Sequence, residues 1–303
     1  MIQENNPEVL KTLDGYSNCI NELLHQGFEI LKNVRESSFS NEEHASFILL
    51  FRETLAFVDA IVPLIRLPSK EGVSIILRSI CEADLYLRYM IEKDVTNRIL
   101  AYQVCYAREK LLNYEKHDLK NEKSKSLLKN WKNDEIAKKI PFIEIDYAVY
   151  SIPLVSMLSR EPFKSIDQEY KRIKKVNGKP KWYSLWDGPR TIEDLFRYMN
   201  RPIIYEEIYR TWSGIVHPNA SFSNIVSKNG EGGIPFLHIP DDIPFLFKIL
   251  YFVLTTLYLD IICKIVPDYK LEYAKWYMIR FKPIWDQVKD VKFESEVIIV
   301  KNT

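Results

Sequence analysis

The chain has 303 residues, 27% of them charged, with a formal net charge of +1, which is the composition of an ordinary globular protein. It contains only nine glycines and no glycine-rich phosphate loop, which argues against a dinucleotide-binding fold or a P-loop enzyme. The balance of 42 basic against 41 acidic residues gives no global reason to expect a polyanionic partner.

The compartment is inferred from the N-terminus and the cysteines. The first residues lack the basic and apolar regions of a signal peptide. The four cysteines form no Cys-x-x-Cys pair, and each lies within an apolar helical pattern. We therefore expect reduced, buried thiols and a cytoplasmic protein.

Helical periodicity dominates the first part of the chain. Apolar residues recur at helical spacing over 7–36. A second helix is predicted from Ser40, where Glu43 completes a capping box. Further helices are predicted after Ser69 and over 95–117. The short connections between these helices favour antiparallel neighbours.

The middle of the chain is more charged and less periodic, with helices predicted near 124–139 and 142–159. Over 164–181, seven Lys or Arg residues stand against two acidic residues, and an aromatic loop follows. Basic and aromatic side chains together can bind the backbone and the bases of RNA. The alternatives are a solvated helix face and aromatic rings that close the edge of a core. The candidate RNA-binding residues are Lys171, Arg172, Lys174, Lys175, Lys179, Lys181, Trp182 and Tyr183.

Helical signals return after this region. Thr191 begins a short helix, and Pro202 suits the first turn of the next one. That helix should end near His217, because Pro218 disfavours helical backbone in the residue before it. A loop is predicted over 218–242.

The most apolar segment is Ile243–Val266, which could be a core helix or a membrane anchor. Its uninterrupted apolar part, Ile249–Leu259, is flanked by Lys248 and Asp260. This part is much shorter than the about 20 residues that a membrane span requires. We therefore expect a helix in the core and no membrane contact. Another helix is predicted over 268–289.

Together these elements predict an all-α fold: a multi-helix bundle with an inserted polar and basic middle region and a short C-terminal extension. Residues 1–118 form the N-terminal part of the bundle, and residues 119–190 form the insertion. Residues 191–303 form the C-terminal part and pack with 1–118 as one domain. The tail alternates in polarity and suits a strand or an ordered extension.

Two common kinds of catalytic centre have no sequence signature. The five histidines are scattered, with no His-Glu-x-x-His and no Cys/His group at ligand spacing. No Gly-x-Ser-x-Gly nucleophile motif occurs. The sequence therefore predicts no metal site and no cofactor.

Arg210 and His217 form the best candidate for chemistry. Seven residues make about two helical turns, which places both side chains on one face. The helix C-terminus favours a protonated imidazole. In metal-free RNA cleavage, an imidazole takes the proton of the ribose 2′-hydroxyl and a guanidinium stabilises the phosphorane. The alternatives are a histidine that caps the helix carbonyls and a buried hydrogen-bonded pair.

Arg78 and Glu82 lie four residues apart in a strongly apolar helix. Charges in such a helix are costly unless they are paired. The pair is either a self-contained ion pair that fixes the helix register or part of a cavity shared with His217. In the second case Glu82 would orient the imidazole or hold its protonated form.

Two segments resemble an uncharacterised bacterial all-helical family, one of the numbered domains of unknown function. The first runs from Leu77 to Ala83 and continues with Leu85, Leu87 and Tyr89. The second is Tyr209–Pro218, which the Trp182-Tyr183 loop precedes. The resemblance covers roughly residues 40–260. That family is similar in motif layout to HEPN domains (higher eukaryotes and prokaryotes nucleotide-binding).

The resemblance to HEPN domains implies a function. Those domains are helical bundles, many are metal-independent ribonucleases of toxin–antitoxin, CRISPR or phage-defence systems, and their active sites form across a dimer. Arg210 and His217 match the Arg-x4–6-His signature at its long end, as the catalytic pair. Thr211 stands where Asn, Asp or His is more usual. The supporting residues are Arg78, Glu82, Thr211 and Ser213.

Three classes of function follow. The first is a HEPN-like endoribonuclease that acts as a toxin or an anti-phage effector. The second is a non-catalytic helical module that binds a nucleotide or a partner protein. The third is a membrane-associated effector that uses Ile243–Val266. The expected partners are RNA, a second copy of the chain with His217 near the interface, and a protein of the same defence or toxin system.

Overall fold

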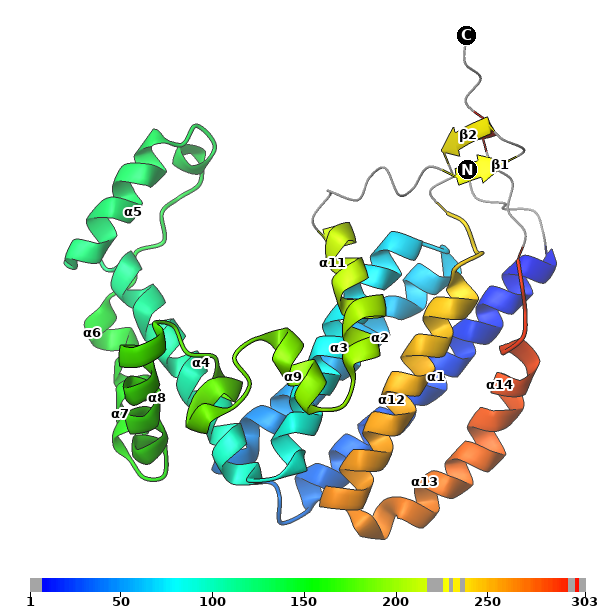
Figure 1. Cartoon of the computed structure of the whole chain (residues 1–303), viewed down its shortest axis with the longest axis horizontal. Coiled ribbons are helices and arrows are strands. Elements are labelled where there is room, and N and C mark those ends of the chain that lie inside the picture. Colours follow the sequence, from blue (N-terminus) through cyan, green and yellow to red (C-terminus); the bar gives the residue numbers. More distant parts are fainter. Residues whose placement is uncertain (1–6, 217–225, 229–230, 235–237, 294–297, 300–303) are drawn as a thin grey trace. The chain divides into compact units, whose positions relative to one another are not determined.

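The chain folds almost entirely into helices, so the predicted all-α multi-helix fold is confirmed (Figure 1). The computed structural model describes residues 7–216, 226–228, 231–234, 238–293 and 298–299. Contacts divide the chain into two compact units: unit 1 comprises residues 1–93 and 196–303, and unit 2 comprises residues 94–195. Unit 2 therefore includes the helix before the polar stretch 119–190.

Unit 1 is a bundle of long helices. In sequence order α1, α2 and α3 pack on one another, and α12 packs on α1 and α3. The C-terminal helix α14 packs on α1. Their bounds are α1 Pro7–Glu36, α2 Ala45–Arg66, α3 Lys70–Glu92, α12 Ile243–Ile265, α13 Lys270–Trp276 and α14 Lys282–Val288, with a π-helical turn, η7 Tyr277–Phe281, before α14.

The start of α2 differs from the prediction. A 3-10 turn, η1 (Glu42–His44), comes before it. The Asn41 side chain caps this turn by accepting a hydrogen bond from the His44 N–H at 3.0 Å. The predicted capping box at Ser40 is therefore wrong by one residue, because Asn is an equally good cap. The predicted start of α3 after Ser69 is confirmed.

A close approach of three helices sets the core of unit 1. Tyr258 of α12 is fully buried, and its hydroxyl donates to the carbonyl of Leu23 in α1 at 2.9 Å. A Cβ on Gly27 would lie 2.5 Å from that hydroxyl oxygen and 2.4 Å from a methyl group of Leu55. Glycine at this position therefore allows α1, α2 and α12 to pack together.

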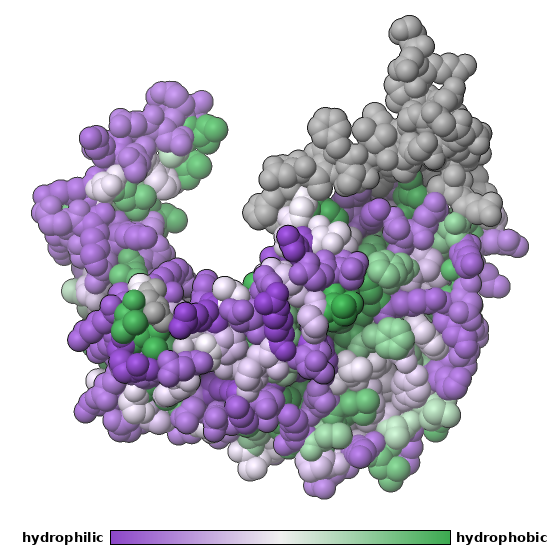
Figure 2. All heavy atoms as spheres, viewed as in Figure 1, coloured by the Kyte–Doolittle hydropathy of each residue, from purple (hydrophilic) through white to green (hydrophobic). Residues whose placement is uncertain are grey.

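Helix α12 has two different faces. Among the described residues it is the one helix long and apolar enough to cross a membrane, yet 67% of its most apolar window is buried within the fold. A helix of this kind also occurs in the core of soluble proteins. Its remaining face exposes Phe245, Phe252 and Leu259. Apolar side chains accordingly reach the surface along α12 and α13 (Figure 2).

Unit 2 is smaller. Helix α4 packs against α8 and against η3, and the basic stretch 164–181 is largely the helix α8. This helix buries Phe163, Ile166, Tyr170 and Ile173 at helical spacing. The bounds are α4 Val95–His117, α5 Glu122–Asn133, η2 Ala137–Lys139, α6 Tyr147–Tyr150, α7 Ile152–Ser159, α8 Phe163–Asn177 and η3 Trp182–Asp187.

A buried carboxylate joins α4 to α8 in unit 2. Asp167 is 3% exposed and accepts hydrogen bonds from the Arg108 guanidinium, with Nε at 2.5 Å from Oδ1. Lys171 lies 2.7 Å from the same carboxylate. Burial raises the pKa of Asp167, but the hydrogen bonds from both cations outweigh burial and hold the pKa below its ordinary value.

Arg210 lies on a helix that is assembled from three pieces, and a separate short helix precedes it. Helix α9 (Ile192–Tyr198) begins at the predicted cap, where the side chains and backbone amides of Thr191 and Asp194 bond reciprocally. After a turn at 199–201, α10 (Pro202–Ile204), a π-helical stretch η4 (Tyr205–Arg210) and α11 (Thr211–Val216) follow one another without a break and form one helix.

The expected loop over 218–242 contains two short strands. These are β1 (Val226–Lys228) and β2 (Glu231–Ile234), which pair antiparallel with Val226 opposite Gly233. The tail supplies β3 (Ile298–Ile299), which pairs with β2. The three strands form one small sheet with β2 in the centre.

The cysteines lead to the first prediction. Cys19 and Cys81 are buried, Cys105 is half-buried and Cys263 is exposed, in contrast to the expectation that all four are buried. Burial raises the pKa of Cys19 and of Cys105 to about 12, and it raises the pKa of Cys81 as well. Since the thiolate is the reactive form, we expect one fast-reacting thiol with Ellman's reagent at pH 8. All four should react after unfolding in guanidinium.

A pair of variants checks this assignment. Cys263→Ser should remove the fast phase, and Cys105→Ser should leave it intact. A fast phase that survives in Cys263→Ser would contradict the assignment.

Candidate functional site

The two segments singled out in the sequence lie side by side. Helix α3 packs against η4 and α11. The first segment belongs to α3, and η4 with α11 contains residues 209–216 of the second. A π-helical turn inside a longer helix is frequent at functional sites. The place where α3 meets η4 and α11 is therefore the first candidate site.

Arg78 of α3 is held by three contacts. Its Nε donates a hydrogen bond to the hydroxyl of Ser213, 135 positions away in the sequence, at 2.9 Å. Its guanidinium carbon lies 4.1 Å from the centre of the Tyr209 ring, which is a cation–π contact. Its Nη1 lies 3.7 Å from a carboxylate oxygen of Glu82. The guanidinium is therefore fixed in position and in orientation.

Glu82 accepts hydrogen bonds from two tyrosine hydroxyl groups. Tyr209 donates to one carboxylate oxygen at 3.0 Å, and Tyr86 donates to the other at 2.7 Å. Ser213 in turn donates to the backbone carbonyl of Tyr209 at 2.6 Å. We call Arg78, Glu82, Tyr86, Tyr209 and Ser213 the α3–α11 cluster.

The α3–α11 cluster is partly open to solvent. The Arg78 side chain is 22% exposed, and the Glu82 side chain is 30% exposed. The ion pair is thus neither a fully buried pair nor a solvated surface pair. A guanidinium stacked on an aromatic ring and still in reach of solvent can bind a phosphate or a carboxylate. The ion pair is not confined to α3, because Arg78 and Glu82 also bind Ser213 and Tyr209 of the second segment.

Arg210 lies on the outer side of the same helix. Its side chain is 68% exposed, and its Nη1 lies 3.0 Å from the carboxylate of Glu206. Thr211 is exposed and donates its hydroxyl to the backbone carbonyl of Glu206 at 3.0 Å. Arg210 is therefore accessible to a ligand. His217 lies outside the described residues, which reach Val216 in this helix.

A second polar cluster lies on α3, six residues nearer the C-terminus of the helix than the first. Asp84 and Arg88 are only 2% and 5% exposed. Asp84 binds Arg88 and Arg201, each at 2.7 Å, and Arg88 also pairs with Asp260 and donates to the hydroxyl of Thr256 at 2.7 Å. Burial raises the pKa of the Asp84 carboxyl, and the two guanidinium groups oppose this shift.

The second cluster positions the first. Arg201 directly precedes Pro202, the first residue of the helix that contains Tyr209 and Ser213. The Asp84–Arg201 ion pair therefore fixes the start of that helix against α3. Arg88 connects the same carboxylate to α12.

The candidate RNA-binding residues of unit 2 have varied surroundings. Lys171 pairs with Asp167, Arg172 pairs with Glu169, and Lys179 pairs with Glu109. Lys174, Lys175 and Lys181 are exposed. Trp182 and Tyr183 are buried, at 8% and 4% exposed, because η3 packs on α4. Their buried rings close the core of unit 2, which was the alternative to stacking on a base.

Three contributors to the site were not predicted from the sequence. Tyr209 and Tyr86 were not singled out, although both lie within or beside the resembling segments. The Asp84 and Arg88 pair has the same four-residue spacing in the same apolar helix as Arg78 and Glu82, and that spacing was the available signal.

Within the described ranges, no three side chains of His, Cys, Asp or Glu gather into a possible metal site.

The two clusters should respond differently to mutation. Asp84→Asn removes the carboxylate between two guanidinium groups, one of them buried, so we expect the free energy of unfolding to fall by about 3 kcal/mol or more. Glu82→Gln acts on a partly exposed pair and keeps one acceptor, so a loss of about 1 kcal/mol is expected. Urea denaturation of both variants, with the exposed Glu53→Gln of α2 as a control, measures the difference. Equal losses for both variants would contradict the separate roles.

Comparison with known proteins identifies a family. Comparison with curated proteins and with solved structures finds no match. A family model described as "Family of unknown function (DUF5677)" matches residues 44–234. The matched range includes α3, η4 and α11, and thus every residue of the α3–α11 cluster. Since the match covers more than half of the chain, the protein belongs to this family of unknown function, as the resemblance to such a helical family predicted.

Proposed function

We propose that the protein is a metal-independent endoribonuclease of the HEPN type, with RNA as its substrate. One observation carries the proposal: Arg78 and Glu82 contact Ser213 and Tyr209, residues of the segment that contains Arg210 and His217. The sequence offered only a resemblance as a reason to bring these segments together. Their contact supports a shared site, with Arg78 as a second fixed cation.

The helix geometry favours cooperation between Arg210 and the cluster. Arg210 and Ser213 are three residues apart and are therefore neighbours on the helix surface. The helix is α-helical from Thr211 to Val216. Four positions separate Ser213 from His217 in the sequence, which is the spacing that puts two side chains on one face of an α-helix. Arg78, bound to Ser213, then lies beside the same face.

In the proposed reaction His217 acts as a general base. It takes the proton of the ribose 2′-hydroxyl, and the 2′-oxygen forms a bond to phosphorus. The bond between phosphorus and the 5′-oxygen breaks, and this oxygen takes a proton from water and leaves as a 5′-hydroxyl, while the protonated His217 returns its proton to the solvent. Arg210 and Arg78 stabilise the negative charge of the phosphorane, and Glu82 is a positioning residue for Arg78. The products are a 2′,3′-cyclic phosphate and a 5′-hydroxyl.

Variants of the motif test the proposal. His217→Ala and Arg210→Ala should each abolish cleavage of total RNA in EDTA without a change in the melting temperature. Arg210→Lys should also fail, because an ammonium does not reproduce the planar fork of the guanidinium on phosphate oxygens. The cyclic phosphate is detected by mass spectrometry of the products.

Matched controls keep this test specific. His25→Ala replaces an exposed histidine of α1. Arg66→Ala removes an exposed arginine that, like Arg210, pairs with a carboxylate, Asp14, at 3.2 Å. Both should cleave as the wild type does. Cleavage by His217→Ala protein would overturn the proposal. RNA binding without cleavage by the wild type would favour the alternative, a non-catalytic helical module.

The resemblance to HEPN domains extends the proposal to biology. It suggests a cytoplasmic toxin or anti-phage effector that acts with a protein of the same system, and a homodimer. Aromatic side chains are favoured at protein interfaces, but in the last helices Tyr251, Tyr258, Tyr273 and Trp276 are buried inside unit 1. The exposed Phe245, Phe252 and Leu259 support a different face, since their seven-residue spacing is that of a helix seam.

One substitution tests the dimer. Phe252→Asp places a charge in the middle of the exposed α12 face and should convert a dimer into a monomer in sedimentation velocity at about 10 µM, because a charge at an apolar seam opposes association. Leu49→Asp is the control, since Leu49 is equally exposed on α2, at 63% against 58% for Phe252. A wild-type monomer, or a dimer that Phe252→Asp leaves intact, would contradict this part of the proposal.

A further inference from the structure

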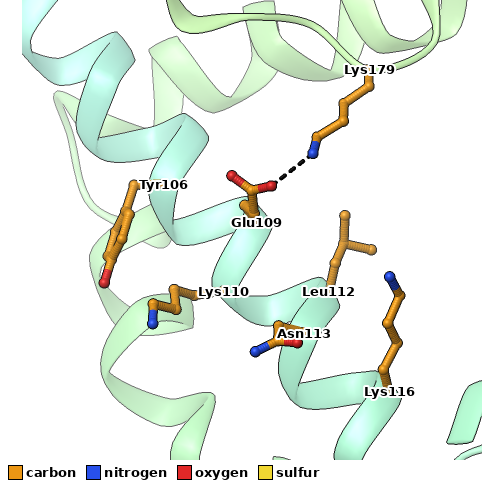
Figure 3. Close-up of a pocket in the computed structure, with 7 residues that line it drawn as sticks. All are labelled: Tyr106, Glu109, Lys110, Leu112, Asn113, Lys116 and Lys179. Atoms are coloured by element: carbon orange, nitrogen blue, oxygen red, sulfur yellow. Dashed lines mark hydrogen bonds and ion pairs between the residues drawn. The ribbon is translucent and has the colours of Figure 1, made fainter. Parts of the chain in front are cut away.

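Unit 2 has an open cavity that the proposed reaction does not use (Figure 3). Its volume is about 450 Å³. One face of α4 forms most of its wall, and the chain after α8 contributes one side chain. The residues that matter here are Tyr106, Glu109, Lys110, Asn113, Lys116 and Lys179.

The α4 residues line the cavity because of their spacing. Positions 106, 109, 110, 113 and 116 recur at intervals of three or four residues, which places them on one helix face. From Tyr106 to Lys116 that face extends about 15 Å along the helix. The cavity is therefore a strip with an aromatic ring at one end and a lysine at the other.

The charge of the cavity is positive. Lys110, Lys116 and Lys179 stand against the single carboxylate of Glu109. Glu109 accepts a hydrogen bond from Lys179 at 2.7 Å. This bond, together with the charges of Lys179, Lys181 and Lys116, lowers the pKa of Glu109. The carboxylate thus already lies in a field that favours an anion.

Tyr106 supplies a stacking surface next to these charges. Its side chain is 56% exposed, in contrast to the buried Trp182 and Tyr183. The Lys110 ammonium lies 5.5 Å from the centre of the Tyr106 ring. Asn113, one turn from Lys110 and Glu109, offers an amide that can both donate and accept hydrogen bonds. Bases stack on such exposed rings when lysines bind the neighbouring phosphates.

We infer that this cavity binds a short single strand of nucleic acid, with one phosphate between Lys116 and Lys179 and the base of a neighbouring nucleotide on Tyr106. Without a ligand, Lys179 donates its hydrogen bond to Glu109, and a bound phosphate takes the place of this carboxylate. The inference concerns binding by unit 2 and holds whether or not the chain cleaves RNA. A single nucleotide is too short to reach from Tyr106 to Lys116, so the experiment compares a strand with a mononucleotide.

The experiment measures binding to the full-length His217→Ala protein, so that cleavage cannot interfere. The probes are a fluorescein-labelled 12-nucleotide single-stranded RNA, followed by anisotropy, and AMP, followed by calorimetry. Lys116→Glu and Lys179→Glu should each weaken binding about tenfold in 0.1 M salt. Tyr106→Ala should weaken it about fivefold or more, through the lost stacking.

Glu109→Gln gives the most specific result. It removes the internal competitor of the phosphate and should tighten binding severalfold, whereas loss of a structural ion pair would not. Lys125→Glu, on exposed α5 of the same unit, is the charge-matched control and should change binding less than twofold. Circular dichroism and the melting temperature of each variant establish that it is folded.

The outcomes separate the possibilities. Binding of the oligonucleotide with this variant profile, and much weaker binding of AMP, supports the inference. Binding of AMP as tight as that of the oligonucleotide would overturn a strand as the ligand. Equal weakening by Lys116→Glu and Lys125→Glu shows non-specific attraction and overturns it. Weaker binding by folded Glu109→Gln, or no binding of either probe, also overturns it. RNA cleavage is measured separately with the wild-type protein.

Discussion

The arrangement of unit 1 depends on one buried carboxylate. Asp84 is almost inaccessible, and two guanidinium groups bind it from different parts of the chain. An unpaired charge at this depth would cost several kcal/mol, so Asp84, Arg88 and Arg201 must come together when the helices pack. Arg88 reaches α12, and Arg201 begins the helix that contains η4 and α11. The carboxylate therefore sets where α11 meets α3.

The position of the candidate site follows from that placement, but its charged side chains are less buried than Asp84 and Arg88. The α3–α11 cluster has the same four-residue acid and base spacing on α3, but its side chains are partly exposed. Two tyrosine hydroxyls and a serine satisfy groups that water would otherwise solvate. Such a cluster adds less stability than the buried one, and its guanidinium stays within reach of a ligand. One helix thus supplies a structural ion pair and a candidate binding group six residues apart.

Periodicity in the sequence predicted the fold well because helix packing depends on it. The bounds of α1 and α4 coincide with the predicted ranges, and the start of α9 at Thr191 follows its capping residues. The start of α2 was misplaced, since Asn41 rather than Ser40 caps the 3-10 turn before it, and α2 itself begins at Ala45 without a side-chain cap. Helix α8 was not predicted, because charged residues interrupt its apolar pattern, although Ile166, Tyr170 and Ile173 keep the helical spacing.

Contacts between distant segments could not be predicted from the same patterns. Nothing in the spacing of Arg78 or Ser213 shows that they meet, and a resemblance was the only reason to join their helices. The burial of Trp182 and Tyr183 depends on η3 packing against α4, which composition does not encode. Tyr106 lies outside the basic run and was not considered, yet it is the exposed ring beside Lys110.

The near-neutral net charge is compatible with anion binding because pairing is uneven along the chain. On α8, Lys171 and Arg172 are occupied by carboxylates of their own helix, so the basic run is less available than its count suggests. In the α4 cavity three lysines share one carboxylate, and that carboxylate is exposed and exchangeable. Water already screens the Glu109–Lys179 pair. A phosphate can therefore take the place of Glu109 as the partner of Lys179 at little cost in free energy. A local excess of cations over fixed carboxylates, rather than total charge, therefore decides where an anion can bind in this protein.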